Sequence, residues 1–167
     1  MSFLGPLRTV IGHPMRAYYV PILGGLVLGG SAFMPWIVVG SDRYGGVPDL
    51  AAFWVLGLAA LVLVLAGLSI ATRKNSRHPL LLVGLFAFGV LFLSERLMER
   101  AAAQQGWAAE QARAIVTGGE ARAVSEPTMA PGAYIGLGAS TLIALFGLTV
   151  VVKRVPQIHA LPEDDDV

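Results

Sequence analysis

Three histidines and eleven acidic residues are the side chains with which this chain could bind a metal or transfer a proton. His13, His78 and His159 show no HxxxH spacing, and neither a cysteine nor a cluster of carboxylates accompanies them, as a zinc site would require. None of them lies in an apolar stretch, where a haem ligand between helices would be placed. We interpret the three histidines as polar residues at an aqueous boundary and predict no metal and no cofactor.

Glu95 and Glu99 are the acidic pair whose spacing best fits acid–base chemistry, because they lie one helical turn apart. Arg96 and Arg100 alternate with them, and this alternation is typical of a lattice of surface ion pairs. The pattern therefore predicts solvated charge at these four positions, without a catalytic role.

The residue patterns that several other kinds of chemistry or binding require are absent as well. The chain has no cysteine, which removes disulfides, thiolate metal sites and thiol nucleophiles. A formal net charge of +1, with no basic cluster interleaved with aromatics, gives no basis for nucleic-acid binding. The glycine pairs at 24–25 and 29–30 lie inside an apolar run and do not follow a strand, unlike phosphate-binding loops. We predict that the chain is not an enzyme and does not bind nucleic acid.

Apolar stretches dominate the sequence: 55% of residues are hydrophobic, 14% are charged, and the mean hydropathy is +0.67. Four stretches contain no charge at all, and they reach or approach the roughly 20 residues that cross a bilayer: 20–39, 50–71, 79–94 and 132–152. They also contain no histidine, which argues against a transporter that depends on a membrane-embedded ionisable group. The predicted fold class is all-α, a bundle of four transmembrane helices.

The predicted helices form one membrane domain over residues 1–155, followed by a disordered acidic tail at 156–167. The apolar part of the third helix ends near Leu93, but good helix formers continue without a proline, so we expect this helix to extend beyond the membrane. A cleavable signal peptide is the alternative for the first helix, but its apolar run continues past any such segment. The predicted bounds are 18–39, 50–71, 79–98 continuing to about 116, and 132–152.

Lysine and arginine positions predict the orientation, since cytoplasmic loops carry an excess of them. One side would hold Arg8, Arg16, Arg73, Lys74, Arg77, Lys153 and Arg154, and the other Arg43, Arg96, Arg100, Arg113 and Arg122. We therefore expect a multi-pass protein of the bacterial plasma (inner) membrane with both termini in the cytoplasm. The predicted anchors at the membrane interfaces are Tyr18, Tyr19, Trp36, Trp54, Arg73, Lys74, Arg77, Lys153 and Arg154.

Small residues recur along two of the predicted helices. The fourth helix has them at every fourth position and the first has one GxxxG pair: Gly132, Gly136, Ser140 and Ala144, and Gly25 and Gly29. Such residues let helix backbones approach closely in lipid. They indicate either packing within this bundle or a docking face for a partner helix.

Apolar residues also recur at helical spacing in the segment 94–116, namely Leu97, Ala101, Ala108 and Ile115, with Trp107 beside them. A helix outside the membrane must cover such a stripe. We expect it either to fold back on the short loop between the first two helices or to pack on another subunit.

Residues 29–36, Gly-Gly-Ser-Ala-Phe-Met-Pro-Trp, are followed by a glycine-rich turn and by Val-Pro-Asp at 47–49. With Pro131-Gly132 opening the last helix, this layout resembles a broad group of uncharacterised bacterial four-helix membrane proteins. In that group a Leu-Pro-Trp-like triplet ends the first helix, and Met34 stands here in place of the leucine. The resemblance implies a fold and a compartment, without a reaction.

The function expected from the sequence is that of a non-catalytic accessory or structural subunit of a larger membrane complex, of respiratory, photosynthetic, secretion or transport type. Its partners would be the lipid bilayer and other membrane subunits. One alternative is a homo-oligomeric transporter or channel whose pore is lined by Ser31, Ser69, Ser140 and Thr141. Another is a lipid-binding sensor that uses the basic loop at 73–78.

Overall fold

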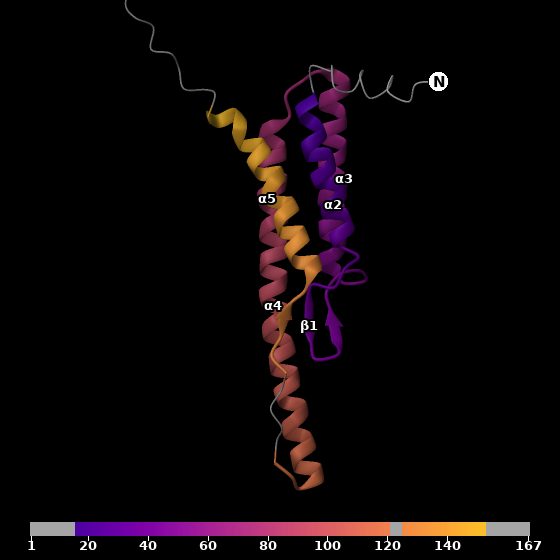
Figure 1. Ribbon diagram of the computed structural model, residues 1–167, viewed down its shortest axis with the longest axis vertical. Helices are drawn as coiled ribbons and strands as arrows, with labels where there is room; N and C mark the ends of the chain where they lie inside the picture. Colours follow the sequence, from indigo (N-terminus) through magenta and orange to yellow (C-terminus); the bar gives the residue numbers. More distant parts are fainter. Residues whose placement is uncertain (1–15, 121–124, 153–167) are drawn as a thin grey trace, which may run out of the picture.

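The structure is a computed structural model that describes residues 16–120 and 125–152, and these are mostly helical (Figure 1). The elements are η1 (Arg16–Tyr18), α2 (Tyr19–Ser31), β1 (Ile37–Val39), β2 (Asp42–Tyr44), α3 (Leu50–Thr72), α4 (Arg77–Thr117), β3 (Thr128–Met129) and α5 (Pro131–Val152). Six positions discussed above, together with the predicted tail at 156–167, lie outside the described residues: Arg8, His13, Arg122, Lys153, Arg154 and His159.

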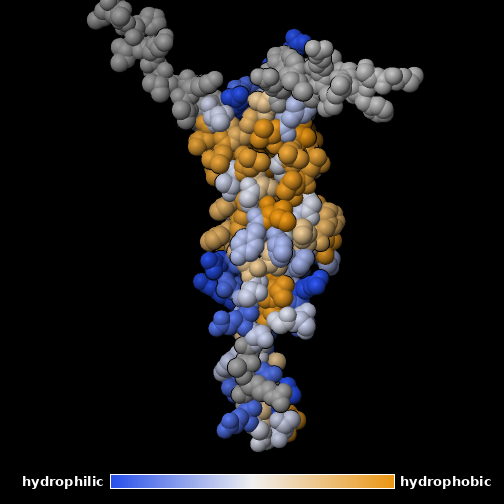
Figure 2. Space-filling view, viewed as in Figure 1, coloured by the Kyte–Doolittle hydropathy of each residue, from blue (hydrophilic) through white to orange (hydrophobic). Residues whose placement is uncertain are grey.

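Three of the helices, α3, α4 and α5, are long and apolar enough to span a membrane, and these spans indicate a membrane protein. The shorter helix α2 is also apolar but has 13 residues. At 1.5 Å per residue it covers about 20 Å, less than the roughly 30 Å of a hydrocarbon core. On the face that Figure 2 shows, apolar side chains form a broad band, with polar side chains gathered below it.

Helix α2 ends at Ser31, eight residues before the predicted end at 39. Pro35 has no N–H for a helical hydrogen bond, and the chain turns before it reaches that position. The N–H groups of Ala32, Phe33 and Met34 bond to carbonyls of the last turn of α2 at 3.1–3.2 Å. The backbone N–H groups of the turn after α2 are therefore hydrogen-bonded within the protein, as backbone groups shielded from water must be.

Residues beyond Pro35 form a small sheet, which the prediction of an all-α fold did not include. The strand order is β2-β1-β3, and both pairings are antiparallel. Ile37 lies opposite Tyr44 on one side and Met129 on the other. Strands of two or three residues are too short to show an alternating pattern, so they could not be predicted from the sequence.

Helix α4 is continuous over 41 residues and ends at Thr117, and Gly118 caps it with a left-handed φ of 64°. At 1.5 Å per residue its length is about 60 Å. Figure 1 shows its lower part projecting beyond all the other elements. We call residues 97–117 the projecting segment. The end of the bundle at the α3–α4 loop is the basic end, and the opposite end is the sheet end.

The bundle is held by α2 packed against both α3 and α5, and by an extensive contact between α4 and α5. The α4–α5 contact depends on glycines. A Cβ atom added at Gly84 would lie 2.6 Å from the backbone nitrogen of Ala144, and one at Gly147 would lie 2.5 Å from that of Leu81. The two backbones therefore meet directly at these positions, which is how small residues promote helix association in lipid.

Candidate functional site

The predicted small-residue face of α5 lies inside the bundle. A Cβ added at Gly132 would come within 2.5 Å of the Pro35 carbonyl oxygen, and one at Gly136 would lie 2.8 Å from the Ser31 hydroxyl oxygen. Ser140 is fully buried, and Ala144 meets α4. This face therefore packs within the chain, the first of the two interpretations of its spacing.

The GxxxG pair of α2 has the same role. A Cβ at Gly25 would lie 3.1 Å from side-chain atoms of Val62 and Leu63, and one at Gly29 would lie 3.6 Å from Ala59. Both glycines therefore face α3. Gly84 and Gly147 could not be recognised as contact residues from the sequence, because neither has a small residue four positions away.

Two of the predicted membrane anchors are buried. Tyr18 and Trp36 are almost inaccessible, whereas Tyr19 and Trp54 are exposed as expected for aromatic residues at an interface. Burial within the chain leaves Tyr18 and Trp36 little surface for headgroup contact, and their assignment as interface anchors stays a prediction. Each is a packing residue at one end of the bundle, because the chain turns beside it and covers it.

Trp36 joins three parts of the sheet end. Its indole Nε1 donates a hydrogen bond to the Ser31 carbonyl oxygen at 3.0 Å. Its backbone N–H donates to Tyr44 at 2.9 Å, and its carbonyl accepts from Ala130 at 2.8 Å. Gly45, with φ 81°, packs so closely that an added Cβ would lie 2.8 Å from the Trp36 Cβ. The end of α2, the β1–β2 hairpin and the start of α5 therefore share one buried side chain.

Glu95 is buried, with 4% of its surface exposed, and does not belong to the predicted lattice of surface charges. The exposed pair in that region is Arg96 with Glu99, whose Nη1 and Oε2 atoms lie 3.0 Å apart. Oε2 of Glu95 has no hydrogen-bond partner among the described residues and lies 3.6 Å from Arg96 Nε. No group of three potential metal ligands occurs in the part of the chain that the structure describes, so Glu95 has no companions for a cation site.

The predicted contact residues of the projecting segment are all exposed. Leu97 and Trp107 expose 56% and 64% of their surface, and Ile115 exposes 80%. Ala101 is exposed as well, whereas its neighbour Ala102 is buried. The stripe neither folds under the described loops nor packs on the sheet. Among the described residues it is an uncovered apolar face.

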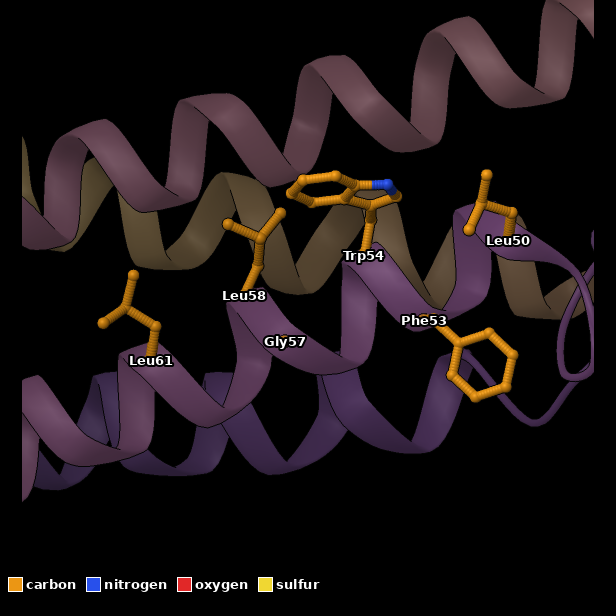
Figure 3. A pocket seen from close by; sticks show the side chains of 6 residues that line it. All are labelled: Leu50, Phe53, Trp54, Gly57, Leu58 and Leu61. Carbon is orange, nitrogen blue, oxygen red and sulfur yellow. The ribbon is translucent and has the colours of Figure 1, made fainter.

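Two apolar grooves open on the sides of the bundle. The first, of about 450 Å³, lies along α3 and is lined by Leu50, Phe53, Trp54, Gly57, Leu58 and Leu61. Figure 3 shows Trp54 and Leu58 directed to the same side of α3, with Phe53 on the other. The second, of about 390 Å³, lies between α4 and α5. Grooves of this kind suit acyl chains or apolar side chains.

The basic end is organised by a polar network around Tyr18. Its hydroxyl donates to Asn75 Oδ1 at 2.8 Å and accepts from the Ser76 N–H at 2.9 Å. Ser69 and Ser76 share a hydrogen bond of 2.6 Å between their hydroxyls. This network fixes the loop that carries Arg73, whose φ of 55° is left-handed, and Lys74.

These features define a helical protein with three candidate membrane spans, a small sheet at one end of the bundle and a helix that extends beyond the bundle. The chain matches no protein-family model, no curated protein and no solved structure.

Proposed function

We propose that this chain is a non-catalytic accessory or structural subunit of a larger bacterial membrane complex, and that it binds a partner subunit through the projecting segment. The observation that carries the proposal is the exposed apolar stripe on that segment. Its residues are Leu97, Ala101, Trp107 and Ile115.

The length of α4 supports this assignment. About 20 residues of the helix suffice to cross roughly 30 Å of hydrocarbon, so a helix that begins at Arg77 leaves the bilayer near Arg96. The stripe then lies in water, where exposed apolar patches mark interaction sites. Tryptophan is a frequent energetic centre of such interfaces, and Trp107 lies in the middle of the segment.

The proposed membrane arrangement is a four-helix bundle in which α2 is the fourth span and both termini are cytoplasmic. Because α2 is short, the turn at 32–36 and the sheet would complete its crossing at the membrane surface. The basic end, with Arg73, Lys74 and Arg77, would face the cytoplasm, in agreement with the positive-inside tendency.

The hydroxyl groups considered for a pore lend no support to a transporter. Ser31 donates to Leu28, and Ser140 and Thr141 both donate to Leu137, so each hydroxyl bonds to a carbonyl of its own helix. Ser69 bonds to Leu65 in the same way and also to Ser76, at the basic end. These residues therefore have no free donors arranged along a shared path.

Gentle solubilisation of native membranes, affinity purification of the tagged chain and mass spectrometry would test the proposal. We expect partner chains at fixed stoichiometry with the wild type, and their loss with the double variant Leu97→Ala, Trp107→Ala. Arg113→Gln is the matched control, because Arg113 lies in the same segment and forms only an exposed pair with Glu110. Elution of the wild type alone or as a homo-oligomer would contradict the proposal.

A further inference from the structure

The cations at the basic end have no acidic partner in the described part of the chain. They are Arg73, Lys74 and Arg77. The ion pairs among the described residues are confined to the part of α4 after Ser94. The described acidic residues all lie at the sheet end or beyond it: Asp42, Asp49, Glu95, Glu99, Glu110, Glu120 and Glu126. The basic end is therefore a positive surface with no internal compensation within residues 16–120 and 125–152.

Arg77 is the cation of this group that the fold holds in place. Its guanidinium carbon lies 5.4 Å from the centre of the Phe146 ring, and Tyr18 meets the same ring edge-on at 5.2 Å. Its Nε is buried without an acceptor, and its side chain forms no ion pair with any residue that the structure describes. Arg77 therefore presents a positioned positive charge that has no partner among the described residues.

The groove between α4 and α5 begins one helical turn from Arg77. On α4 it is lined by Leu81, Leu85 and Phe88, which follow Arg77 at spacings of four, four and three residues and so lie on the same face of the helix. The α5 wall consists of Thr141, Ala144, Leu145 and Leu148. From Arg77 to Phe88 the face extends about 16 Å along the helix, the length of an extended acyl-chain segment.

We propose that Arg77 and this groove together bind one anionic phospholipid. The phosphate pairs with the guanidinium of Arg77, Lys74 and Arg73 on the same loop add attraction for negative charge, and one acyl chain lies in the groove. An anionic phospholipid fits both observations, because it joins an anionic group to an apolar chain in the order in which they occur along α4. This inference is independent of the proposed partner subunit, which would bind at the opposite end of α4.

Native mass spectrometry of the full chain, in nanodiscs that contain phosphatidylcholine and phosphatidylglycerol, would test the site. We expect the wild type to retain one phosphatidylglycerol in preference to phosphatidylcholine. Arg77→Gln should reduce this preference about tenfold, since one charge-assisted pair to the phosphate is lost. Leu85→Trp, which fills the groove but keeps every cation, should also release the lipid.

Arg43→Gln is the matched control, because it removes one exposed cation at the sheet end and should leave lipid retention unchanged. The double variant Arg73→Gln, Lys74→Gln changes only exposed side chains, and it provides a second test if Arg77→Gln fails to fold. Equal retention of both lipids by the wild type would overturn the proposal. So would retention by the Arg77 and Leu85 variants at the level of Arg43→Gln.

Discussion

Single glycines decide how closely two of the helices approach. Gly84 and Gly147 place the backbones of α4 and α5 in direct contact, although neither belongs to a repeated small-residue pattern. Ala144 is recognisable from the sequence because it ends a series of small residues. Gly84, the residue that Ala144 meets, is not. A periodic pattern is visible within one helix, whereas complementarity between two helices is not.

Gly84→Ala should destabilise the protein by about 1–3 kcal/mol, because the added methyl group would overlap the backbone of Ala144. Gly89→Ala is a matched control in the same helix, since no atom lies within 4 Å of its Cβ position. It should be neutral or stabilising by up to about 1 kcal/mol through helix propensity. Thermal unfolding in a single detergent would compare the two. Equal stability of both variants would show that the close contact is absent.

Glu95 supports a second prediction, about a buried charge. Oε2 of its carboxylate lacks a hydrogen-bond donor among the described residues, and a buried polar atom without such a donor costs free energy that an apolar side chain of similar length does not. We expect Glu95→Met to retain or raise the free energy of unfolding by about 1 kcal/mol. Glu99→Met, which removes only the exposed pair with Arg96, should change it by less than about 1 kcal/mol. A marked loss of stability in Glu95→Met would contradict this account.

At the scale of elements, α4 combines two environments in one uninterrupted helix. Its first half packs on α5, and its projecting segment carries exposed apolar residues. Intrinsic helix preference must therefore supply much of the stability of that segment, which contains many alanines and glutamines.

Ala108→Pro should break the projecting segment without unfolding the bundle. Proline costs about 3 kcal/mol inside a helix, and Ala108 is an exposed residue far from α5. We expect lower helix content by circular dichroism, loss of the proposed partner and an unchanged unfolding midpoint for the bundle. Ala108→Ser is the control for the side-chain change alone. A large fall in the midpoint would show that the segment supports the bundle.

The three longer helices were predictable from the sequence, and the first helix with its sheet was not. The structure has Leu50–Thr72 and Pro131–Val152 where charge-free runs predicted 50–71 and 132–152. The predicted first helix at 18–39 was too long, because an apolar run does not reveal where the chain turns. Trp36 was assigned to the surface for the same reason. Its burial depends on the turn at Gly45 and on Ala130, which is distant in sequence.

At the scale of the whole molecule, the described acids lie near the sheet or on the projecting segment, whereas arginines occur at both ends. Figure 1 places the α3–α4 loop and the projecting segment at opposite ends of the molecule. The proposed orientation rests on the short loops, where the basic end carries Arg73, Lys74 and Arg77 and the sheet end carries Arg43.

The absence of cysteine from the chain makes this orientation directly measurable. We expect Lys74→Cys to react with a membrane-impermeant maleimide only after cells are opened, and Ser41→Cys and Gln105→Cys to react in intact cells with a permeabilised outer envelope. All three positions are exposed, so differences in labelling report the side of the membrane. Labelling of all three from the same side would contradict the proposed topology.

The pairing of β1 with β3 also constrains the order of assembly. Val38 lies opposite Thr128, 90 residues later in the chain, and Ala130 bonds to Trp36 across a similar separation. Contacts between such distant residues form late, because the intervening chain must first be ordered. During synthesis, the β1–β2 hairpin and Trp36 therefore stay partly exposed until residues 128–130 have been made. We expect the three-stranded sheet to form only after the chain has been synthesised up to the start of α5.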